Sequence, residues 1–286
     1  MGLLLITRFT LQEAIRRRLF LAMLILGFLL LGLFALTLQK SIGSLTATDP
    51  EPERVLLLSA AVTLPAMWIV YMLSSILTIL FTIGMLSNEI DAGTLVLIIP
   101  KPLRRSELVL GKWLGHALIV SLYTTLLFLA FVGVIYWQSG YLPDQFLSAL
   151  GMLLLGMLTL LGLTTLGSAL YPTAVNGAIA LVLFLAAPIV SIVQAFQVDT
   201  SSLAIQNIAT LIDLILPLNA FWHTAALYLT PSSAFFIMQG VSERSYGGSI
   251  PFMSPQPIAP AMFIWGLLYI VVLPTIAVLH FNKRDL

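Results

Sequence analysis

Residues 87–115, SNEIDAGTLVLIIPKPLRRSELVLGKWLG, decide the fold, because they interrupt an otherwise apolar chain with seven charges. The acidic residues are Glu89, Asp91 and Glu107, and the basic residues are Lys101, Arg104, Arg105 and Lys112. Apolar segments flank the stretch at 55–86 and 113–137. Charged side chains are costly in hydrocarbon, and irregular backbone exposed to lipid cannot satisfy its hydrogen bonds. We therefore expect the stretch to lie outside a membrane, as a loop between two spans.

The order of residues within this loop predicts short helices. Asn88 can cap a turn whose early acids suit the positive end of the helix dipole. Gly93 can end that turn, Pro100 and Pro102 fix a bend, and Ser106 can cap the helix that enters the next span. The expected product is a short, partly apolar helix at the membrane surface with a basic corner.

The composition places the chain in a membrane. Of its 286 residues, 59% are hydrophobic and 9% are charged, and its mean hydropathy is +1.05. Soluble domains carry about 25% charged residues. The sequence contains no cysteine, which excludes disulfides, thiolate metal sites and cysteine nucleophiles. No polar region is long enough for a core of its own, so we expect one transmembrane domain over residues 1–286.

Six apolar segments are long enough to cross a bilayer, which takes about 20 helical residues. They are 19–38, 55–86, 113–137, 146–170, 174–196 and 261–281. The expected fold class is therefore an all-α integral membrane protein with six transmembrane helices. Residues 1–18 show an amphipathic pattern that favours a helix lying in the interface. A signal peptide is the alternative, but segment 19–38 lacks a small-residue cleavage site and should remain as a span.

The basic residues orient these segments. With the N-terminus inside, ten of the thirteen Lys and Arg residues lie on the cytoplasmic side, and none lies within a predicted span. The exceptions are Lys40 and Arg54, in an expected outer loop at 39–54, and Arg244. The positive-inside rule therefore predicts that both termini and the loop at 87–112 are cytoplasmic.

The fourth segment contains four glycines, which form two pairs that each lie nearly in line along a helix. Gly151 and Gly162 are eleven residues apart, as are Gly156 and Gly167, so each pair is separated by about three turns. Such positions permit helices to pack closely. The alternative is that glycine is simply common in membrane helices.

Residues 197–260 depart from the pattern of simple spans. Four isoleucines between 205 and 215 share one helical face and polar residues the other, Pro217 ends that helix, and a second helix can extend over 218–230. Neither helix suits a span, because Asp213 and His223 would need burial. We expect an amphipathic or re-entrant hairpin at the outer face, where Trp222 and these two residues could line an exit gate. An interfacial anchor is the commoner role of a tryptophan.

The loop at 87–112 resembles the intracellular loop of the ABC-2 type permeases, the membrane subunits of a family of ATP-driven exporters. The matching residues are Glu89, Gly93, Thr94 and Leu95, followed by Lys101, Pro102, Arg105, Glu107, Gly111 and Lys112. The resemblance implies that the loop carries a coupling helix that docks into a groove of the ATPase subunit. It also implies short gate helices before the last span. The alternative is that the basic residues only fix the topology.

Motifs for chemistry in this chain itself are missing from the sequence. The histidines at 116, 223 and 280 are far apart and form no H-E-x-x-H motif, so we expect no metal site. His116 fits an ordinary interfacial histidine. Gly111-Lys112-Trp113 lacks the remaining residues of a phosphate loop, and the predicted spans contain no acid to drive a proton- or sodium-coupled carrier. Energy should therefore come from a partner.

The sequence thus predicts a non-enzymatic permease subunit for ATP-driven export of an apolar or amphipathic substrate, such as a lipid, a lipid-linked glycan or a hydrophobic peptide. We expect ATP and Mg²⁺ on partner ATPase subunits, no cofactor on this chain, a second permease copy, lipid contacts and no nucleic acid. The expected location is the bacterial cytoplasmic membrane. Two alternatives are a subunit that transmits ATPase work to an extracytoplasmic partner in cofactor maturation or motility, and an assembly factor without an ATPase.

Overall fold

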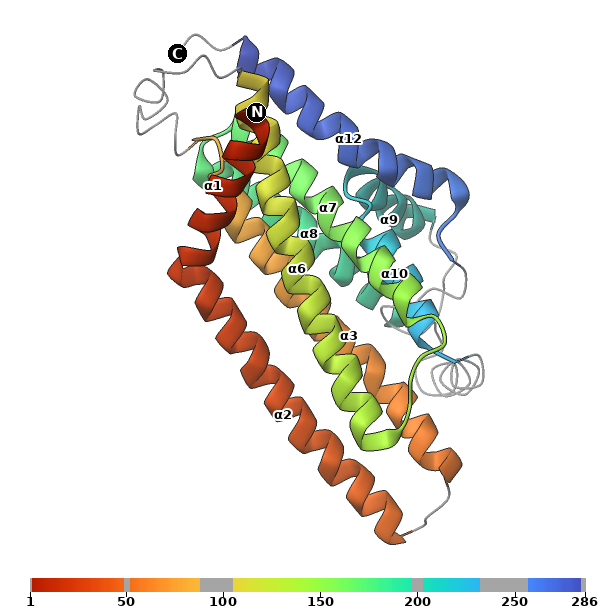
Figure 1. The fold of residues 1–286 in the computed structure, drawn as a ribbon. Helices are drawn as coiled ribbons and strands as arrows, with labels where there is room; N and C mark the ends of the chain where they lie inside the picture. Colours follow the sequence, from red (N-terminus) through yellow and green to blue (C-terminus); the bar gives the residue numbers. More distant parts are fainter. Residues whose placement is uncertain (1, 49–51, 88–104, 197–202, 232–256, 284–286) are drawn as a thin grey trace.

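The computed structural model describes residues 2–48, 52–87, 105–196, 203–231 and 257–283, and these residues form α-helices without a β-strand. The helices are α1 (Gly2–Arg16), α2 (Arg18–Thr48), α3 (Pro52–Thr82), α6 (Arg105–Ser139), α7 (Phe146–Leu170), α8 (Thr173–Phe196), α9 (Leu203–Ile215), α10 (Leu218–Leu229) and α12 (Pro260–Asn282). Both ends of the chain lie at the same end of the bundle (Figure 1).

Five of these helices are long and apolar enough to cross a membrane. They are Arg18–Ser44, Leu58–Thr82, Arg105–Ser139, Phe146–Leu170 and Pro260–Asn282. The fifth predicted span corresponds to α8, a helix of 24 residues. Its apolar part over the described residues, Thr173–Ala186, is shorter than the length needed to cross a membrane. The all-α membrane class is confirmed, and the count of six spans stays a prediction.

The expected loop at 39–54 is wrong over most of its length. Helix α2 continues to Thr48, and α3 begins at Pro52. Proline suits the first turn of a helix, because a backbone N–H at that position would have no hydrogen-bond partner within the helix. The polar stretch after residue 38 is therefore helical, because leaving the membrane ends the hydropathy signal but not the helix.

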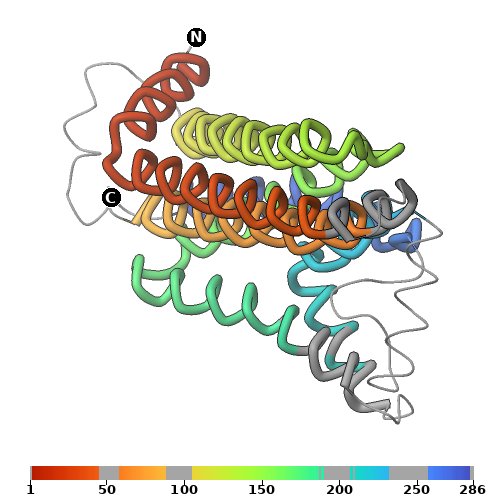
Figure 2. The backbone as a smooth tube through the Cα atoms, turned by 90° about the horizontal axis from the view of Figure 1, so that it is seen from below, coloured from red at the N-terminus to blue at the C-terminus, as the bar shows by residue number. Residues whose placement is uncertain are grey.

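Helices α3, α6 and α7 form the centre of the bundle, and the others pack around them (Figures 1 and 2). Helix α7 contacts α3, α6, α8, α10 and α12, and the predicted close packing at its glycines is found at three of the four. A Cβ at Gly156 would lie 3.0 Å from Leu218 of α10, and one at Gly162 3.7 Å from Leu273 of α12. Gly167 faces Asn176 of α8, whereas no atom lies within 4 Å at Gly151.

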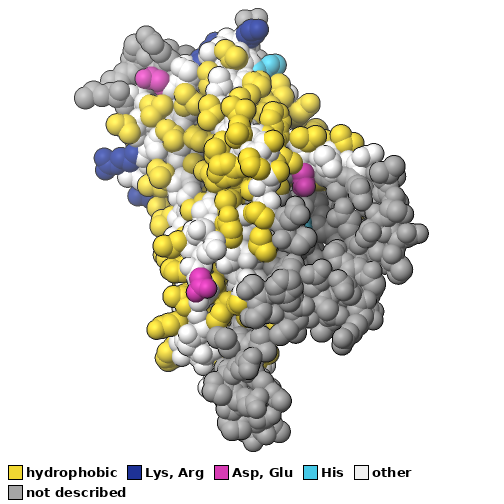
Figure 3. Space-filling view, turned by 90° about the vertical axis from the view of Figure 1, so that its right-hand side faces the viewer, with side chains coloured by type: hydrophobic (Ala, Val, Ile, Leu, Met, Phe, Trp, Pro, Cys, Tyr) yellow, Lys and Arg dark blue, Asp and Glu magenta, His cyan; other side chains and the backbone are white. Residues whose placement is uncertain are grey.

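The outer surface of the bundle is apolar. Figure 3, which views the molecule from the α12 side, shows hydrophobic side chains over most of the described face, with basic side chains in its upper part. On α12, Ile264, Leu268, Val271 and Leu279 are all exposed. A contiguous apolar surface of this kind suits contact with lipid or another membrane subunit.

Candidate functional site

The predicted coupling residues fall into two groups. Outside the described residues lie Glu89, Gly93, Thr94, Lys101, Pro102 and Arg104. The other four, Arg105, Glu107, Gly111 and Lys112, lie at the start of α6. The structure therefore describes the base of the loop, which is residues 82–87 on the α3 side and residues 105–116 on the α6 side.

Lys112 joins the two sides of this base. Its side chain is buried, and Nζ donates a hydrogen bond of 3.0 Å to the carbonyl of Met85. Arg105 reaches α12, where its Nη1 lies 3.5 Å from the Phe281 carbonyl and 3.4 Å from the Asn282 carbonyl. Glu107 lies in the first turn of α6, where an acid suits the helix dipole. Hydrogen bonds thus connect the two ends of the loop to each other, through Lys112, and to the last helix, through Arg105.

Helix α1 docks on α6 through a groove made by two glycines. A Cβ at Gly111 would come within 2.8 Å of Ile6, and one at Gly115 within 2.7 Å of Thr10. Thr7 Oγ1 also donates to the Gly111 carbonyl at 3.1 Å. This is the small-xxx-small arrangement that lets two membrane helices approach closely. The predicted helix at 1–18 therefore exists, and one face of it packs on the bundle.

A polar cluster lies beside this groove. His116 is buried, and its Nδ1 donates to the Lys112 carbonyl at 2.8 Å, so the interpretation as an ordinary interfacial histidine is wrong. Glu13 of α1 pairs with Arg17 at 2.7 Å. Burial raises the pKa of Glu13, but the hydrogen bond and charge of Arg17 outweigh this and hold the pKa below its ordinary value of 4.5.

The inner end of α3 is tied to α7 and α8 as well. Thr82 Oγ1 donates to Thr164 Oγ1 of α7 at 2.6 Å. Asn176 of α8, which is 3% exposed, donates from Nδ2 to the carbonyls of Ile83 at 2.8 Å and Thr164 at 2.9 Å. Ser87 Oγ and the Thr173 hydroxyl lie 2.7 Å apart. We call residues 82–87, 105–116, 164 and 173–176 the loop base.

Two parts of the loop base were not predicted from the sequence. Gly111 and Gly115 have the spacing of a helix-packing motif, which the sequence shows. Asn176 was visible as the one amide near the start of an apolar segment, and polar residues in such segments commonly bond to another helix. Their partners, Ile6 and Ile83, depend on the tertiary arrangement.

The predicted hairpin consists of α9 and α10, joined at Leu216 and Pro217. Its tip is fastened to α12, because Trp265 Nε1 donates to the Leu214 carbonyl at 2.9 Å and the Tyr269 hydroxyl donates to the Ile215 carbonyl. Tyr269 lies nine residues into α12, about 14 Å along it. The hairpin tip is therefore fastened near the middle of α12.

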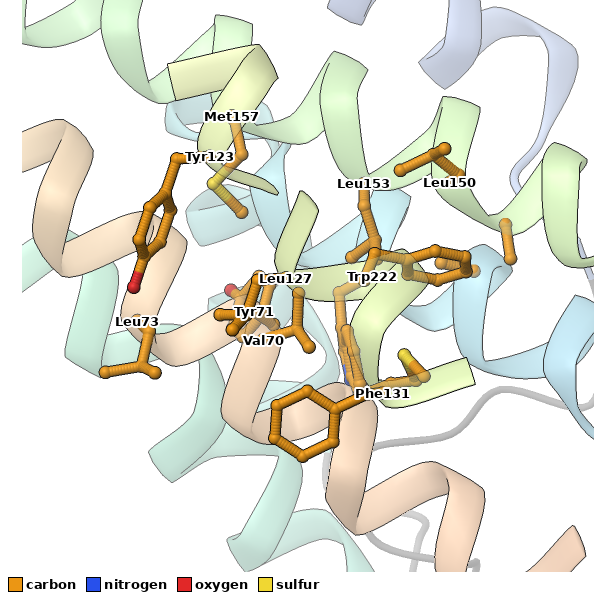
Figure 4. Close-up of a cluster of buried hydrophobic side chains, with 14 of the residues drawn as sticks. Val70, Tyr71, Leu73, Tyr123, Leu127, Phe131, Leu150, Leu153, Met157 and Trp222 are labelled. Atoms are coloured by element: carbon orange, nitrogen blue, oxygen red, sulfur yellow. The ribbon is translucent and has the colours of Figure 1, made fainter. Parts of the chain in front are cut away.

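Trp222 of α10 lies in the centre of the bundle. Its ring centroid is 5.0 Å from that of Trp68 and 4.9 Å from that of Tyr71, both on α3, and Trp68 and Tyr71 stack at 5.0 Å. Figure 4 shows Trp222 and Tyr71 among buried side chains of α3, α6 and α7. Trp222 is 2% exposed, so the interpretation as an interfacial anchor is wrong. We call these three side chains the aromatic cluster.

Asp213 and His223 lie on the two arms of the hairpin. Burial raises the pKa of Asp213 to about 6, although the Asn219 side chain hydrogen-bonds the carboxylate and lowers it. Burial lowers the pKa of His223 to about 4, so its ring is neutral at pH 7. Asp213 Oδ1 is shielded from solvent and has no hydrogen-bond partner. The hairpin thus carries a carboxylate close to the aromatic cluster.

Within the described ranges, no three His, Asp or Glu side chains come together as a metal site would need. In comparisons with known proteins, the family model of the ABC-2 family transporter proteins matches residues 5–286. The comparison with curated proteins gives no match.

Proposed function

Since the chain belongs to the ABC-2 family of transporter proteins, we propose that it forms the membrane pathway through which an ABC transporter exports an apolar or amphipathic molecule. Membership makes the chain a permease subunit, a multi-pass membrane protein that works with ABC ATPase subunits. ATP and Mg²⁺ would be bound by that partner. A second permease copy, identical or not, would complete the pathway.

The observation that carries the proposal is the loop base. Lys112 ties α6 to the end of α3, and Asn176 ties that end to α7 and α8. An ATPase that moved the loop at 87–112 would therefore act on the linked inner ends of four helices, with α1 docked on α6. This is the linkage that a coupling helix needs, and it supports the proposed role of the loop.

The seam between α3 and α7 supports the role of a pathway. Buried hydroxyls follow α3 at Ser59, Thr63, Ser74, Ser75, Thr78 and Thr82. Several of them donate to the carbonyl four residues earlier, as Thr63 does to Ser59 at 2.7 Å and Thr78 to Ser74 at 2.7 Å. Hydroxyls satisfied within their own helix stay satisfied when neighbouring helices separate. The seam can therefore open as a mildly polar surface, which suits an amphipathic cargo.

The proposed orientation has both termini in the cytoplasm of a bacterial cell. Both termini and the loop base lie at one end of the bundle (Figure 1). Lys283 is exposed at the end of α12 there, and Arg16, Arg17 and Arg18 are exposed at the junction of α1 and α2. The positive-inside rule favours that end as the cytoplasmic one.

The test is gentle affinity purification from native membranes, with the identity and stoichiometry of co-purifying proteins as the readout. We expect an ABC ATPase in equal proportion to the permease, lost when residues 101–107 are scrambled. Scrambling the outer turn at 140–145 is the matched control and should retain the ATPase. A well-folded permease that isolates without any ATPase would overturn the proposal. An additional stoichiometric extracytoplasmic protein would instead favour a subunit that transmits ATPase work.

A further inference from the structure

Building on the proposed export function, we infer that the cargo carries a cationic amine or quaternary ammonium group. This group binds Asp213 and the aromatic cluster, between α3 and the α9–α10 hairpin. The remainder of the cargo is apolar. The inference deepens the proposed function by assigning the chemical class of the substrate and its binding residues.

Aromatic rings of the cluster present the surface that such a group recognises. Trp68, Tyr71 and Trp222 have ring centroids within 5.0 Å of one another, so their three ring quadrupoles act at one place. A cation within about 6 Å of an aromatic face is attracted by the ring quadrupole, most strongly by tryptophan. Desolvated sites make this attraction stronger than it is at a protein surface.

Two buried polar atoms at this place have no partner. Among the described residues, neither the Tyr71 hydroxyl, on a side chain 1% exposed, nor Asp213 Oδ1 has a hydrogen-bond partner. Asn219, whose side chain hydrogen-bonds Asp213, lies three residues before Trp222 and on the same side of α10. An unpaired buried polar group costs about 1–3 kcal/mol, and such groups in native proteins commonly mark function. An amine that donates hydrogen bonds would satisfy both atoms, and a quaternary ammonium would balance the charge of Asp213.

The charges near Asp213 select a cation over an anion. Burial raises the pKa of this carboxyl and the Asn219 hydrogen bond lowers it, and no ion pair with a Lys or Arg is found for it among the described residues. His223 is neutral at pH 7. Of the other acidic side chains described, Glu13 and Glu107 lie near the loop base, and Asp144 lies in the α6–α7 turn. An anionic head group would meet an uncompensated negative charge here, whereas a cationic one supplies the missing partner.

The apolar part of the cargo has a surface beside the site. On α9, Ile208, Leu211, Leu214 and Ile215 are all exposed. They lie on the face of α9 opposite to Asp213, so the hairpin presents its carboxylate to the bundle and its apolar face to lipid. This geometry fits an amphiphile whose head is drawn into the bundle and whose tail stays in lipid.

The test uses the permease, with its ATPase where one co-purifies, in nanodiscs of digalactosyldiacylglycerol, a lipid with neither charge nor amine. The probes are decyltrimethylammonium and decyl sulfate, which share a tail length and differ in head charge. Binding is measured by equilibrium dialysis below micellar concentrations, with empty nanodiscs as background. We expect saturable binding of decyltrimethylammonium and none of decyl sulfate. Equal binding of both probes would overturn the inference without any variant.

Variants then locate the site. Asp213→Asn should weaken decyltrimethylammonium binding about tenfold, as expected for loss of one close charge, whereas Asp144→Asn, the same change in an exposed turn, should leave it unchanged. Unchanged binding in Asp213→Asn would refute the assignment of the site. Trp68→Leu, which removes one ring of the aromatic cluster, should weaken binding severalfold and serves if the first variant misfolds, and unchanged binding would count against the site in the same way.

Two further arms separate the possible outcomes. Displacement of the probe by added phosphatidylethanolamine would identify a membrane lipid as the amine, whereas a probe that remains bound points to another amphiphilic amine. The binding assay needs no ATP. A permease that binds the cation but has no ATPase would therefore refute the proposed function alone, and one with an ATPase but no charge selectivity would refute this inference alone.

Discussion

Substitutions at Asn176 and Gly167 should have strongly coupled effects on the free energy of unfolding. Asn176 Nδ2 donates two interhelical hydrogen bonds, to Ile83 and Thr164, and its Oδ1 occupies the place that a Cβ at Gly167 would take. Asn176→Ala removes both bonds directly. Gly167→Ala should remove them indirectly, because the new methyl group expels the amide.

The magnitudes follow from the number of hydrogen bonds. A hydrogen bond between membrane helices contributes about 0.6 kcal/mol on average and at most about 1.7. Two bonds therefore predict a loss of about 1–3 kcal/mol for each single variant. In the Asn176→Ala background the amide is gone, so Gly167→Ala should cost nothing and can gain up to about 1 kcal/mol of helix propensity. The expected coupling energy is thus about 1–3 kcal/mol.

The assay is reversible unfolding of the four variants in mixed micelles with rising dodecyl sulfate, followed by circular dichroism and analysed as a double-mutant cycle. Gly151→Ala on the same helix is the matched control, because no atom lies within 4 Å of the added Cβ, and it should behave alike with and without Asn176. Additive effects of Gly167→Ala and Asn176→Ala would refute the reasoning. A neutral Asn176→Ala would show that the amide does not tie α3 to α7 and α8.

Three further predictions address the rest of the loop base and the hairpin. Gly115→Leu should separate α1 from α6, because even a Cβ at this position would lie 2.7 Å from Thr10. The substitution should lower the free energy of unfolding by about 1–3 kcal/mol and raise hydrogen exchange in α1. Gly133→Leu is the control, because a Cβ at Gly133 has no atom within 4 Å. Lys112→Met should retain ATPase binding but lower transport per ATP hydrolysed severalfold, and unchanged coupling would contradict the role of the loop base. The pKa of Asp213 is raised from 3.8 to about 6, so its ionised form costs the fold at most about 3 kcal/mol at pH 7.5. This cost disappears below about pH 3, where the folded and unfolded chains are both protonated, so Asp213→Asn should raise Tm at pH 7.5 and leave it unchanged at about pH 3.

Hydropathy predicted the spans well because a bilayer demands about 20 apolar helical residues in a row. The predicted segments 146–170 and 261–281 differ by at most one residue at each end from Phe146–Leu170 and Pro260–Asn282. The prediction failed at 39–54, where the helices leave the membrane. A helix in water needs no apolar run, so its continuation to Thr48 leaves no mark in a hydropathy pattern.

The candidate sites were predictable only where a residue type is energetically unfavourable in the environment that the sequence predicts for it. Asp213 was identified because an acid at membrane depth needs an explanation. Trp222 was misread because an aromatic side chain is equally apolar against lipid and against another helix, and only the contacts with Trp68 and Tyr71 distinguish the two. The roles of Glu89, Lys101 and the other coupling residues at 88–104 stay predictions.

Helix α3 links the two ends of the proposed mechanism. Thr82 lies at the loop base and Tyr71 in the aromatic cluster, and they are eleven residues apart on one helix, about 16 Å. The single proline of α3, Pro65, lies beyond Trp68 on the outer side, so no proline interrupts the segment that joins the two sites. Trp222 belongs to α10, which is fastened to α7 and, through the hairpin tip, to α12. A tilt of α3 driven from the loop base would therefore move Trp68 and Tyr71 away from Trp222, and we infer that the stroke of the ATPase opens the cation site by separating these rings.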